Sequence, residues 1–391
     1  MRKVLVWLSG GVDSAVSAYL LKEAWYDVTA WFMINYLDEE NPNCPTKVDL
    51  QVAKEVAEFL NIPFFTFDYR QEYSNKVLDY MFEWYKKGIT PNPDVMCNKE
   101  IKFKMFLDEA MDLWFDYIAT GHYARVVKSE KWIVNSWIDF VIPAKAGIFN
   151  NVQDDLIDPR VNHEDDDVDW QFLIFHLLKW VDSTKDQSYF LAFLNQYQLS
   201  KSLFPIWWLE KKEVREIAEK IWLPNAKRKD SQWICFVWKV DFKKFLEKKI
   251  KPKEWNIIDT SWKILWKHRG VYYYTIWQRK WIEIWWLKEP IFVIKKDIER
   301  NDLIVWTSWD IKLYSNKLYC NNLTFISEVY DFPLKAKAKI RYRQVDQDLE
   351  IIKVWKENFE FVFREKQRAI ASGQVIAVYK WDELIASWVI N

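Results

Sequence analysis

The stretch Ser9-Gly10-Gly11-Val12-Asp13-Ser14 decides the fold of the N-terminal part of this chain. An apolar run at residues 4–8 precedes it, and an amphipathic segment at residues 15–21 follows it. This order predicts a buried strand, a glycine turn and the first turn of a helix. The first N–H groups of a helix have no partner within it, and two glycines let the backbone come close to a ligand. With the flanking hydroxyls, these groups predict a site for phosphate or pyrophosphate.

Two widespread phosphate motifs do not fit this stretch. No lysine follows the second glycine as in G-x-x-x-x-G-K-[ST], and the spacing differs from G-x-G-x-x-G. The pattern S-G-G-x-D-S instead resembles the pyrophosphate loop of enzymes that cleave ATP to AMP and pyrophosphate. An ordinary glycine turn capped by Ser and Asp is the alternative, and the strand and helix expected on either side disfavour it.

The tryptophan and glycine counts are both unusual. The chain contains 26 Trp and only 7 Gly among 391 residues, whereas about 27 glycines would be usual at this length. Trp25 stands where a helix should end and a strand begin, a position that favours the left-handed backbone of glycine. Trp207-Trp208 and Trp285-Trp286 stand at expected turns. We interpret most of these tryptophans as glycine positions whose UGA codons were read with the wrong table. A Trp-rich carbohydrate-binding or membrane-interface protein is the alternative, but such proteins place Trp on exposed faces and not at helix caps.

Charge and composition limit the partners and the location. The 56 basic and 56 acidic residues balance, so any nucleic-acid surface must be a local patch. No run of about 18 apolar residues occurs, and residues 1–3 lead into a strand without the pattern of a signal peptide. The four cysteines, Cys44, Cys97, Cys235 and Cys320, are too few for a disulfide scaffold. We expect a cytoplasmic enzyme with reactive thiols and no membrane partner.

Alternating elements over residues 1 to about 125 predict an α/β fold with a doubly wound parallel sheet. The expected strands are residues 4–8, 28–33, 64–67 and 117–120, and the expected helices are 13–24, 47–60, 70–87 and 98–113. Such sheets bind ligands at the carboxyl ends of their strands. The loop at residues 9–14, Met33 and the turn at residues 119–122 should therefore meet at one edge.

The rest of the chain predicts two smaller domains. Order weakens over residues 126–179, where we expect a long inserted loop at about 132–172 that carries the acidic run 163–169. Helical periodicity returns at 186–200 and 210–220. Strands are expected at residues 272–276, 291–294, 303–305, 336–342, 359–363 and 375–379, which suggests a small β-barrel. The predicted domains are a catalytic domain at 1–205, a small α+β domain at 206–278 and a C-terminal barrel at 279–391.

Two of the cysteines lie in surroundings that favour chemistry. Cys97 follows a proline-stiffened loop at residues 90–94, beside Lys99 and just before an expected helix, so its thiol should ionise readily. Cys235 follows the basic run at residues 227–229. A single free cysteine is more often a small buried residue than a nucleophile. Two of them in basic or helix-start surroundings favour catalysis.

Five blocks of sequence resemble the bacterial tRNA-specific 2-thiouridylases. They begin at Asn92, Ala119, Ser183, Lys229 and Arg341 and read NPDVMCNKEIKF, ATGHYAR, STKDQSYF, KDSQWICF and RYRQ. They occur in the family's order and, from the residue 9 loop to the residue 372–374 block, span nearly the whole chain. The family pattern has glycine at Trp7, Trp114, Trp233, Trp238, Trp277 and Trp281, which supports the interpretation of these positions independently of composition. Residues 132–172 are longer than the short hairpin of the family.

The resemblance implies an ATP-dependent tRNA sulfurtransferase. ATP with Mg²⁺ would adenylate the C2 carbonyl of the wobble uridine, and sulfur from a cysteine persulfide would replace the oxygen, giving 2-thiouridine, AMP and pyrophosphate. Cys235 would carry the persulfide, Cys97 would attack it to leave a Cys97–Cys235 disulfide, and Asp94 would act as acid or base. The implied partners are wobble-uridine tRNAs for Glu, Gln and Lys, and a persulfide sulfur-carrier protein or cysteine desulfurase. No metal site is implied, and an iron–sulfur cluster is disfavoured because no Cys-x-x-Cys occurs.

The same resemblance implies two sets of binding residues. ATP would be held by Trp7, Leu8, Ser9, Gly10, Gly11, Val12, Asp13, Ser14, Met33 and Gly121. The tRNA would be contacted by Asn92, Pro93 and Asp94 around a flipped target base, and by His122, Lys185, Asp186, Gln187, Arg341, Tyr342 and Gln374. Without the resemblance, Arg341 and Tyr342 would be interpreted as a solvated strand face, although a basic and aromatic pair also suits phosphate pairing and base stacking.

Two alternative functions are open at this stage. Synthetases of the same ATP-to-AMP superfamily, of the NAD, GMP or tRNA-lysidine type, deliver an amine and need no paired thiols. Replacing Cys97 and Cys235 by Ser would leave such an enzyme active and would abolish a thiolase. A non-catalytic RNA-binding protein would release no pyrophosphate in response to tRNA.

Overall fold

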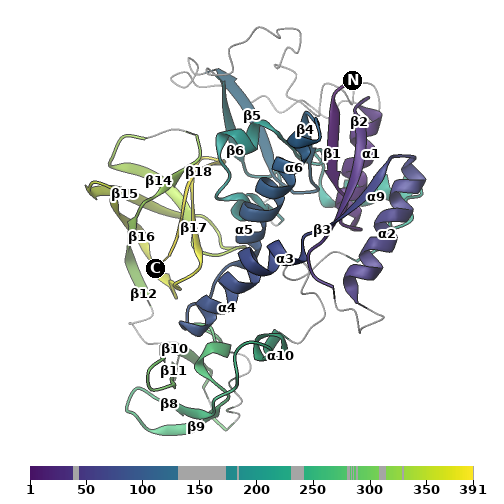
Figure 1. The fold of residues 1–391 in the computed structure, drawn as a ribbon. Coiled ribbons are helices and arrows are strands. Elements are labelled where there is room, and N and C mark those ends of the chain that lie inside the picture. Colours follow the sequence, from purple (N-terminus) through teal and green to yellow (C-terminus); the bar gives the residue numbers. More distant parts are fainter. Residues whose placement is uncertain are drawn as a thin grey trace.

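The computed structural model describes residues 1–37, 44–130, 173–182, 185–229, 242–279, 282, 284, 286–287, 289–307, 314–327 and 330–390. The expected insertion at 132–172 and the segment around Cys235 lie outside the described residues. Figure 1 shows three bodies: a parallel sheet with helices, a small sheet, and a larger antiparallel sheet at the C-terminal end. Helices α4 (Asp79–Lys86) and α5 (Pro93–Cys97) run between them.

The N-terminal part forms the predicted parallel sheet. Its strand order is β3-β2-β1-β4-β7. The strands are β1 (Lys3–Trp7), β2 (Asp27–Ile34), β3 (Phe64–Asp68), β4 (Tyr117–Ala119) and β7 (Ser202–Leu203), the last of which the sequence pattern did not predict. Four of the five residues of β1 are buried, as in a strand covered on both faces. Connections leave β1 in opposite directions toward β2 and β4, so the switch point of the sheet lies between β1 and β4.

Helices cover both faces of this sheet. Alternate residues of β1 enter two core clusters, one shared with α1 (Val12–Glu23), α2 (Pro45–Leu60) and α9 (Lys211–Lys220), the other with α4 and α6 (Phe106–Asp112). The predicted helix at 70–87 is α3 (Arg70–Tyr73), a π-helical segment (Ser74–Leu78) and α4. The predicted helix at 98–113 instead begins with α5 and continues through a π-helical segment (Asn98–Met105) into α6.

Residues 186–200 do not form the single predicted helix. A 3₁₀ helix (Ser188–Leu191) is followed by α8 (Gln196–Ser200). The break occurs because Asn195 caps α8: its side chain accepts from the Gln198 N–H, and the Gln198 side chain accepts from the Asn195 N–H. The cap fixes a new helix start inside the periodic segment.

A four-stranded sheet of order β10-β11-β8-β9 forms the second body. Its elements are α10 (Phe242–Glu247), β8 (Trp255–Ile258), β9 (Ile264–His268), β10 (Ile291–Asp297) and β11 (Asp302–Thr307). The strands expected at 291–294 and 303–305 therefore belong here and not in the barrel, because β11 pairs in parallel with β8. The expected strand at 272–276 is also wrong. Residues Val271–Tyr273 form a 3₁₀ helix, since Gly270 turns the chain at a φ of 136° and the Asn301 side chain accepts from the Val271 N–H.

The third body is a nine-stranded, barrel-like antiparallel sheet. Its strands are β12 (Tyr314–Asn321), β13 (Thr324–Phe325), β14 (Leu334–Lys339), β15 (Gln347–Trp355), β16 (Asn358–Arg368), β17 (Val375–Lys380) and β18 (Glu383–Val389), together with β5 (Arg125–Glu130) and β6 (Leu173–Leu178). The β5–β6 pair comes from the stretch where the sequence predicted no strands. It attaches the barrel to the catalytic domain, where the Lys179 N–H donates to the Asp382 carbonyl at 2.8 Å.

Six tryptophans in the described part of the chain have a positive φ, namely Trp25, Trp114, Trp222, Trp262, Trp277 and Trp381. Three of them directly follow the C-caps of α1, α6 and α9. In each, the Trp N–H and the next N–H bond back to carbonyls of the last turn, as Gly88 and Ile89 do after α4. This is the Schellman arrangement, whose left-handed residue is usually glycine. The backbone thus supports the interpretation of these positions as glycine.

Within the described ranges, no helix combines the length and the apolar character needed to cross a membrane.

Candidate active site

The loop after β1 is built as an anion cradle at the switch point of the sheet. The Ser9 N–H donates to Ser14 Oγ at 3.1 Å, and Ser14 Oγ donates to the Gly11 carbonyl at 3.1 Å. Gly10 has a φ of 77°, and a Cβ there would lie 2.6 Å from the Asp49 carbonyl oxygen. Helix α1 begins at Val12 without a side-chain cap. Its first N–H groups and its dipole are therefore directed at a ligand position.

The turn after β4 closes the cradle from the other side of the switch point. A Cβ on Gly121 would lie 2.7 Å from the Ser14 nitrogen and 2.8 Å from the Asp13 carbonyl carbon. Only glycine allows this approach to the start of α1. The side chains of Trp7, Leu8 and Met33 are buried in the sheet core, so these predicted ATP residues can meet a ligand only through their backbone.

Side chains that the sequence pattern did not single out surround the loop. Asp13 Oδ1 accepts from the Tyr123 hydroxyl at 2.6 Å and from Lys211 Nζ at 2.5 Å. The Gly10 carbonyl accepts from Asn225 Nδ2 at 3.1 Å and from Arg228 Nη1 at 3.0 Å. The basic run at residues 227–229 stands close to Cys235 in the sequence, and no local pattern indicates its contact with the loop.

The loop expected to surround a target base is held from two other parts of the chain. Asn92 caps α5 by accepting from the Val95 N–H at 3.3 Å, and its side chain also bonds to Tyr189. Gln374 Nε2 donates to the Thr90 carbonyl at 2.9 Å. A Cβ on Gly373 would lie 2.5 Å from the same oxygen, so the barrel backbone is pressed against this loop. Gln374 thus shapes the loop whether or not it contacts tRNA.

Pro93 and Asp94 occupy the first turn of α5, where Pro93 is buried and Asp94 is half-buried. A proline suits the first helical position, and an acidic side chain is favoured at a helix N-terminus. The prediction that the helix starts at 98 is corrected here by the Asn92 cap. Asp94 therefore lies at a helix start, and Cys97 does not.

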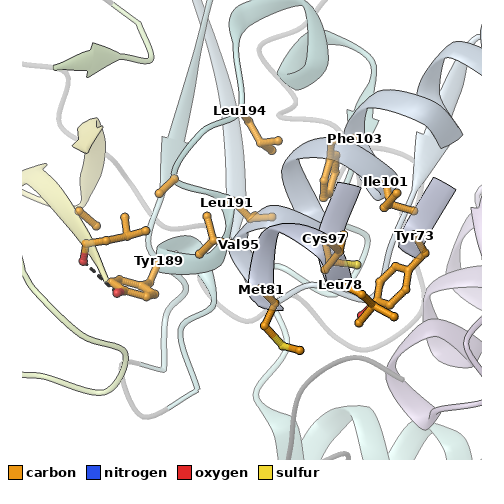
Figure 2. Packing of buried hydrophobic residues seen from close by; sticks show 14 of the residues in the cluster. Tyr73, Leu78, Met81, Val95, Cys97, Ile101, Phe103, Tyr189, Leu191 and Leu194 are labelled. Carbon is orange, nitrogen blue, oxygen red and sulfur yellow. Dashed lines mark hydrogen bonds between the residues drawn. The ribbon is translucent and has the colours of Figure 1, made fainter. Parts of the chain in front are cut away.

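Cys97 is the last residue of α5, and its exposed fraction is 1%. Figure 2 shows it packed among Tyr73, Leu78 and Met81, with Ile101 nearby. Lys99, expected to favour the thiolate, has its Nζ 3.7 Å from Glu100 Oε1 and over the Phe193 ring. Glu100 partly balances the Lys99 charge, which weakens its expected effect on the Cys97 thiol. Cys235, its expected partner, lies outside the described residues.

His122 is a buried neutral imidazole. Its Nδ1 is 2.7 Å from Thr120 Oγ1, and its ring lies against Phe103 and Phe204. Burial, and secondly the charge of Lys102, hold the pKa of His122 well below its ordinary value of 6.5. At neutral pH this residue can offer a hydrogen bond but no positive charge to an RNA.

The expected tRNA contacts Lys185, Asp186 and Gln187 differ in exposure. Lys185 and Gln187 are half-buried, and Gln187 Oε1 accepts from the Tyr123 N–H at 2.9 Å. Asp186 is buried: it accepts from two backbone N–H groups and from the Ser188 hydroxyl, and its Oδ2 lies 3.3 Å from Lys339 Nζ. Asp186 therefore joins the catalytic domain to the barrel instead of facing solvent.

Arg341 and Tyr342 lie in the turn after β14, not on a strand as expected. Arg341 donates to the Arg368 carbonyl, and burial lowers the pKa of its guanidinium. The Tyr342 ring lies 4.3 Å from the Phe190 ring and 6.2 Å from the Tyr189 ring. The structure thus brings Asn92, Arg341 and Tyr342 together around Tyr189.

No three His, Cys, Asp or Glu side chains gather as a set of metal ligands among the residues whose placement is given above. The two clusters described, the cradle at residues 9–14 and the loop at residues 90–94, combine backbone groups, amides, hydroxyls and cations with the carboxylates of Asp13, Asp49 and Asp94. They suit phosphates and a nucleobase.

A glycine loop at the switch point of a parallel sheet, with two appended β-domains, defines a pyrophosphate-loop nucleotide-binding protein. Family models match nearly all of it: the tRNA methyl transferase HUP domain at residues 2–139 and 165–239, the tRNA methyl transferase PRC-barrel domain at 243–307, and the aminomethyltransferase beta-barrel domain at 315–390.

Curated relatives match over the full chain. The tRNA-specific 2-thiouridylase MnmA of Streptococcus thermophilus is 38% identical over 396 residues, covering 100% of this chain and 95% of that protein. The tRNA-specific 2-thiouridylase MnmA of Lactobacillus gasseri is 38% identical over 397 residues with the same coverage. Among solved structures, the U34-tRNA thiolase NcsA of Methanococcus maripaludis aligns with a TM-score of 0.34 and 20% identity, covering 63% of this chain and 64% of that chain. The chain belongs to the tRNA-specific 2-thiouridylase family and is a tRNA sulfurtransferase.

Proposed function

We propose that this chain transfers sulfur to C2 of the wobble uridine of tRNA in a reaction that consumes ATP, in the cytoplasm. The ATP step rests on the cradle at residues 9–14, where Gly10 and the facing Gly121 of the turn after β4 have no room for a side chain. Family membership carries the choice of tRNA and sulfur. The partners would be wobble-uridine tRNAs for Glu, Gln and Lys, and a persulfide sulfur carrier or cysteine desulfurase.

In the first step ATP, accompanied by Mg²⁺, lies with its phosphates on residues 9–14. The C2 oxygen of uridine attacks the α-phosphate, the bond to the β-phosphate breaks, and pyrophosphate leaves. An amide-like carbonyl carbon then carries AMP as leaving group. The helix N-terminus stabilises the negative charge on the departing phosphates.

In the second step the terminal sulfur of a Cys235 persulfide attacks C2, and AMP leaves. The Cys97 thiolate then attacks the Cys235 sulfur, which frees 2-thiouridine and forms a Cys97–Cys235 disulfide. A thiol reductant restores both cysteines before the next turnover. Because Cys97 is 1% exposed, tRNA binding must open the packing around α5. Asp94, at the start of α5, would exchange a proton with the base.

The tRNA presents its wobble base to residues 92–94 after flipping it out of the anticodon stack. Arg341 and Tyr342 meet this loop through Tyr189, which supports a role at the phosphates and bases next to the target. Gln187 extends the contact toward the nucleotide loop by accepting from the Tyr123 N–H, and Lys185 would add a cation two residues earlier.

The test is reconstitution of the full chain with MgATP, wobble-uridine tRNA, a persulfide donor and a thiol reductant, with nucleosides read by mass spectrometry. We expect 2-thiouridine from the wild type and from Cys320→Ala, a control thiol buried in β12. Cys235→Ser should release pyrophosphate and leave the uridine adenylated, with no 2-thiouridine. If Cys97→Ser and Cys235→Ser both retain full 2-thiouridine formation, the thiol chemistry is wrong. If the wild type releases pyrophosphate but forms no 2-thiouridine, amine transfer becomes the better explanation.

A further inference from the structure

Two cations converge on the residue 9–14 loop from a part of the chain far along the sequence. Lys211 is the first residue of α9, and its Nζ lies 2.5 Å from Asp13 Oδ1. Arg228 donates through Nη1 to the Gly10 carbonyl at 3.0 Å, and its Nη2 forms an ion pair with Asp49. Both side chains are largely buried against the loop.

The loop itself carries no positive charge. A helix N-terminus supplies the equivalent of about half an elementary charge. The departing pyrophosphate carries several negative charges, so the cradle needs full cations beside it. Phosphate-transfer sites generally supply these as lysine or arginine.

We propose that Lys211 and Arg228 form the cationic part of the pyrophosphate site, binding the β- and γ-phosphates of ATP and then the released pyrophosphate. This inference rests on the proposed ATP-dependent function and adds two residues to its phosphate site. Asp13 and Asp49 hold the two cations beside the loop, so little side-chain entropy remains to be lost when the phosphates bind.

Arg228 also affects the backbone conformation of the loop at residues 9–14. Asn225 and Arg228 together fix the Gly10 carbonyl. Because a peptide unit is planar and trans, a fixed Gly10 carbonyl also fixes the direction of the Gly11 N–H, which belongs to the same unit. Arg228 therefore supplies charge and orients the Gly11 N–H, which donates to Ser9 Oγ at 3.4 Å in this structure.

The helix α9 packs on α1 through Val214 and Ala218, in the core cluster that α1 shares. This packing fixes the distance between Lys211 and the start of α1. Lys212, the next residue, is 84% exposed and pairs with Glu216 on the outer side of the helix. It serves as a matched control, with the same charge on the same turn but no contact with the loop.

The experiment measures the binding of MgATP, inorganic pyrophosphate and AMP to the full chain by calorimetry. We expect Lys211→Met and Arg228→Gln each to raise the Kd for MgATP and for pyrophosphate at least tenfold. The Kd for AMP, which has no β- or γ-phosphate, should stay within twofold. Arg228→Lys should lie between wild type and Arg228→Gln because it keeps the charge and loses the planar fork. Lys212→Met should bind all three as wild type does.

Two results would overturn the inference. Unchanged pyrophosphate affinity in Lys211→Met and Arg228→Gln would show that neither cation meets the phosphates. A parallel loss of AMP and pyrophosphate affinity would show that the variants merely distort the loop. If the wild type binds neither ATP nor pyrophosphate, the proposed function itself is wrong, and the inference fails with it.

Discussion

Replacing Trp114 by glycine should stabilise this protein. Trp114 follows the C-cap of α6, with a φ of 62° and 85% of its surface exposed. Its N–H bonds to the Met111 carbonyl, and the Phe115 N–H bonds to the Ala110 carbonyl, which completes a Schellman motif. The indole therefore occupies a left-handed position and buries almost nothing in return.

The magnitude follows from two opposing terms. A left-handed backbone costs an ordinary L-residue roughly 1–2 kcal/mol, and glycine avoids this cost. Glycine also makes the unfolded chain more flexible, which removes about 0.5–1 kcal/mol of the gain. We expect a net stabilisation of about 1 kcal/mol for Trp114→Gly. The same cap geometry at Trp25 and Trp222 predicts about 3 kcal/mol for the triple variant, because the three sites lie on different helices.

Urea unfolding followed by far-UV circular dichroism measures this effect as a rise in midpoint at constant slope. Trp355→Gly is the matched control: Trp355 is also exposed, but it ends strand β15 and is not among the positive-φ residues. It should lose up to about 1 kcal/mol. A Trp114→Gly variant no more stable than the parent, or an equal gain from Trp355→Gly, would refute the reasoning. Peptide mass spectrometry of the protein from its own organism should find glycine at Trp25 and Trp114.

Three further predictions concern other parts of the chain. Above pH 6.5 His122 is neutral in both the folded and the unfolded chain, and below pH 6.5 only the unfolded chain readily takes up a proton. The free energy of unfolding should therefore decrease as the pH is lowered below 6.5, by up to about 1.4 kcal/mol per pH unit. His122→Asn should flatten this dependence in unfolding curves measured between pH 5.5 and 7.5. Lys339→Met leaves the buried Asp186 carboxylate without its cation and should cost about 3–5 kcal/mol, whereas exposed Lys335→Met on the same strand should change the unfolding midpoint little. Gln374→Glu removes the hydrogen bond to the Thr90 carbonyl, which contributes about 1 kcal/mol. The variant should lower kcat/KM for tRNA about fivefold without changing the KM for ATP. An unchanged kcat/KM would exclude a role of Gln374 in shaping the loop at residues 90–94.

The sequence predicted best what depends on periodicity and on glycine chemistry. The four strands expected in the parallel sheet all formed: β1, β2 and β4 are largely buried apolar runs, and β3 is a more exposed edge strand with three phenylalanines. The loop at residues 9–14 was placed correctly since its strand, turn and helix are adjacent in sequence. The position of Trp25 after a helix predicts the left-handed backbone conformation that the structure shows there.

Contacts between distant segments were beyond prediction. Nothing local marks β6 as a strand that joins a sheet from the other end of the chain, or Lys211 as a neighbour of Asp13. Asp186 lies in a polar stretch typical of a surface, yet it is buried because Lys339 and Ser188 satisfy it. Cys97 was expected at a helix start and is inside the helix because Asn92 caps it five residues earlier.

These distant contacts explain why three bodies are needed for one site. The loop at residues 90–94 leads into α5, which begins the continuous helical stretch at residues 93–112. The barrel holds the loop through Gln374, the 3₁₀ helix holds it through Tyr189, and the second body touches it where Thr90 Oγ1 donates to Thr275 Oγ1 at 3.4 Å. Each contact is weak alone, but together they fix the residues proposed to receive the base. A tRNA that bridges the barrel and the catalytic domain would therefore act on this loop through several supports at once, which provides a physical route for opening the packing around Cys97.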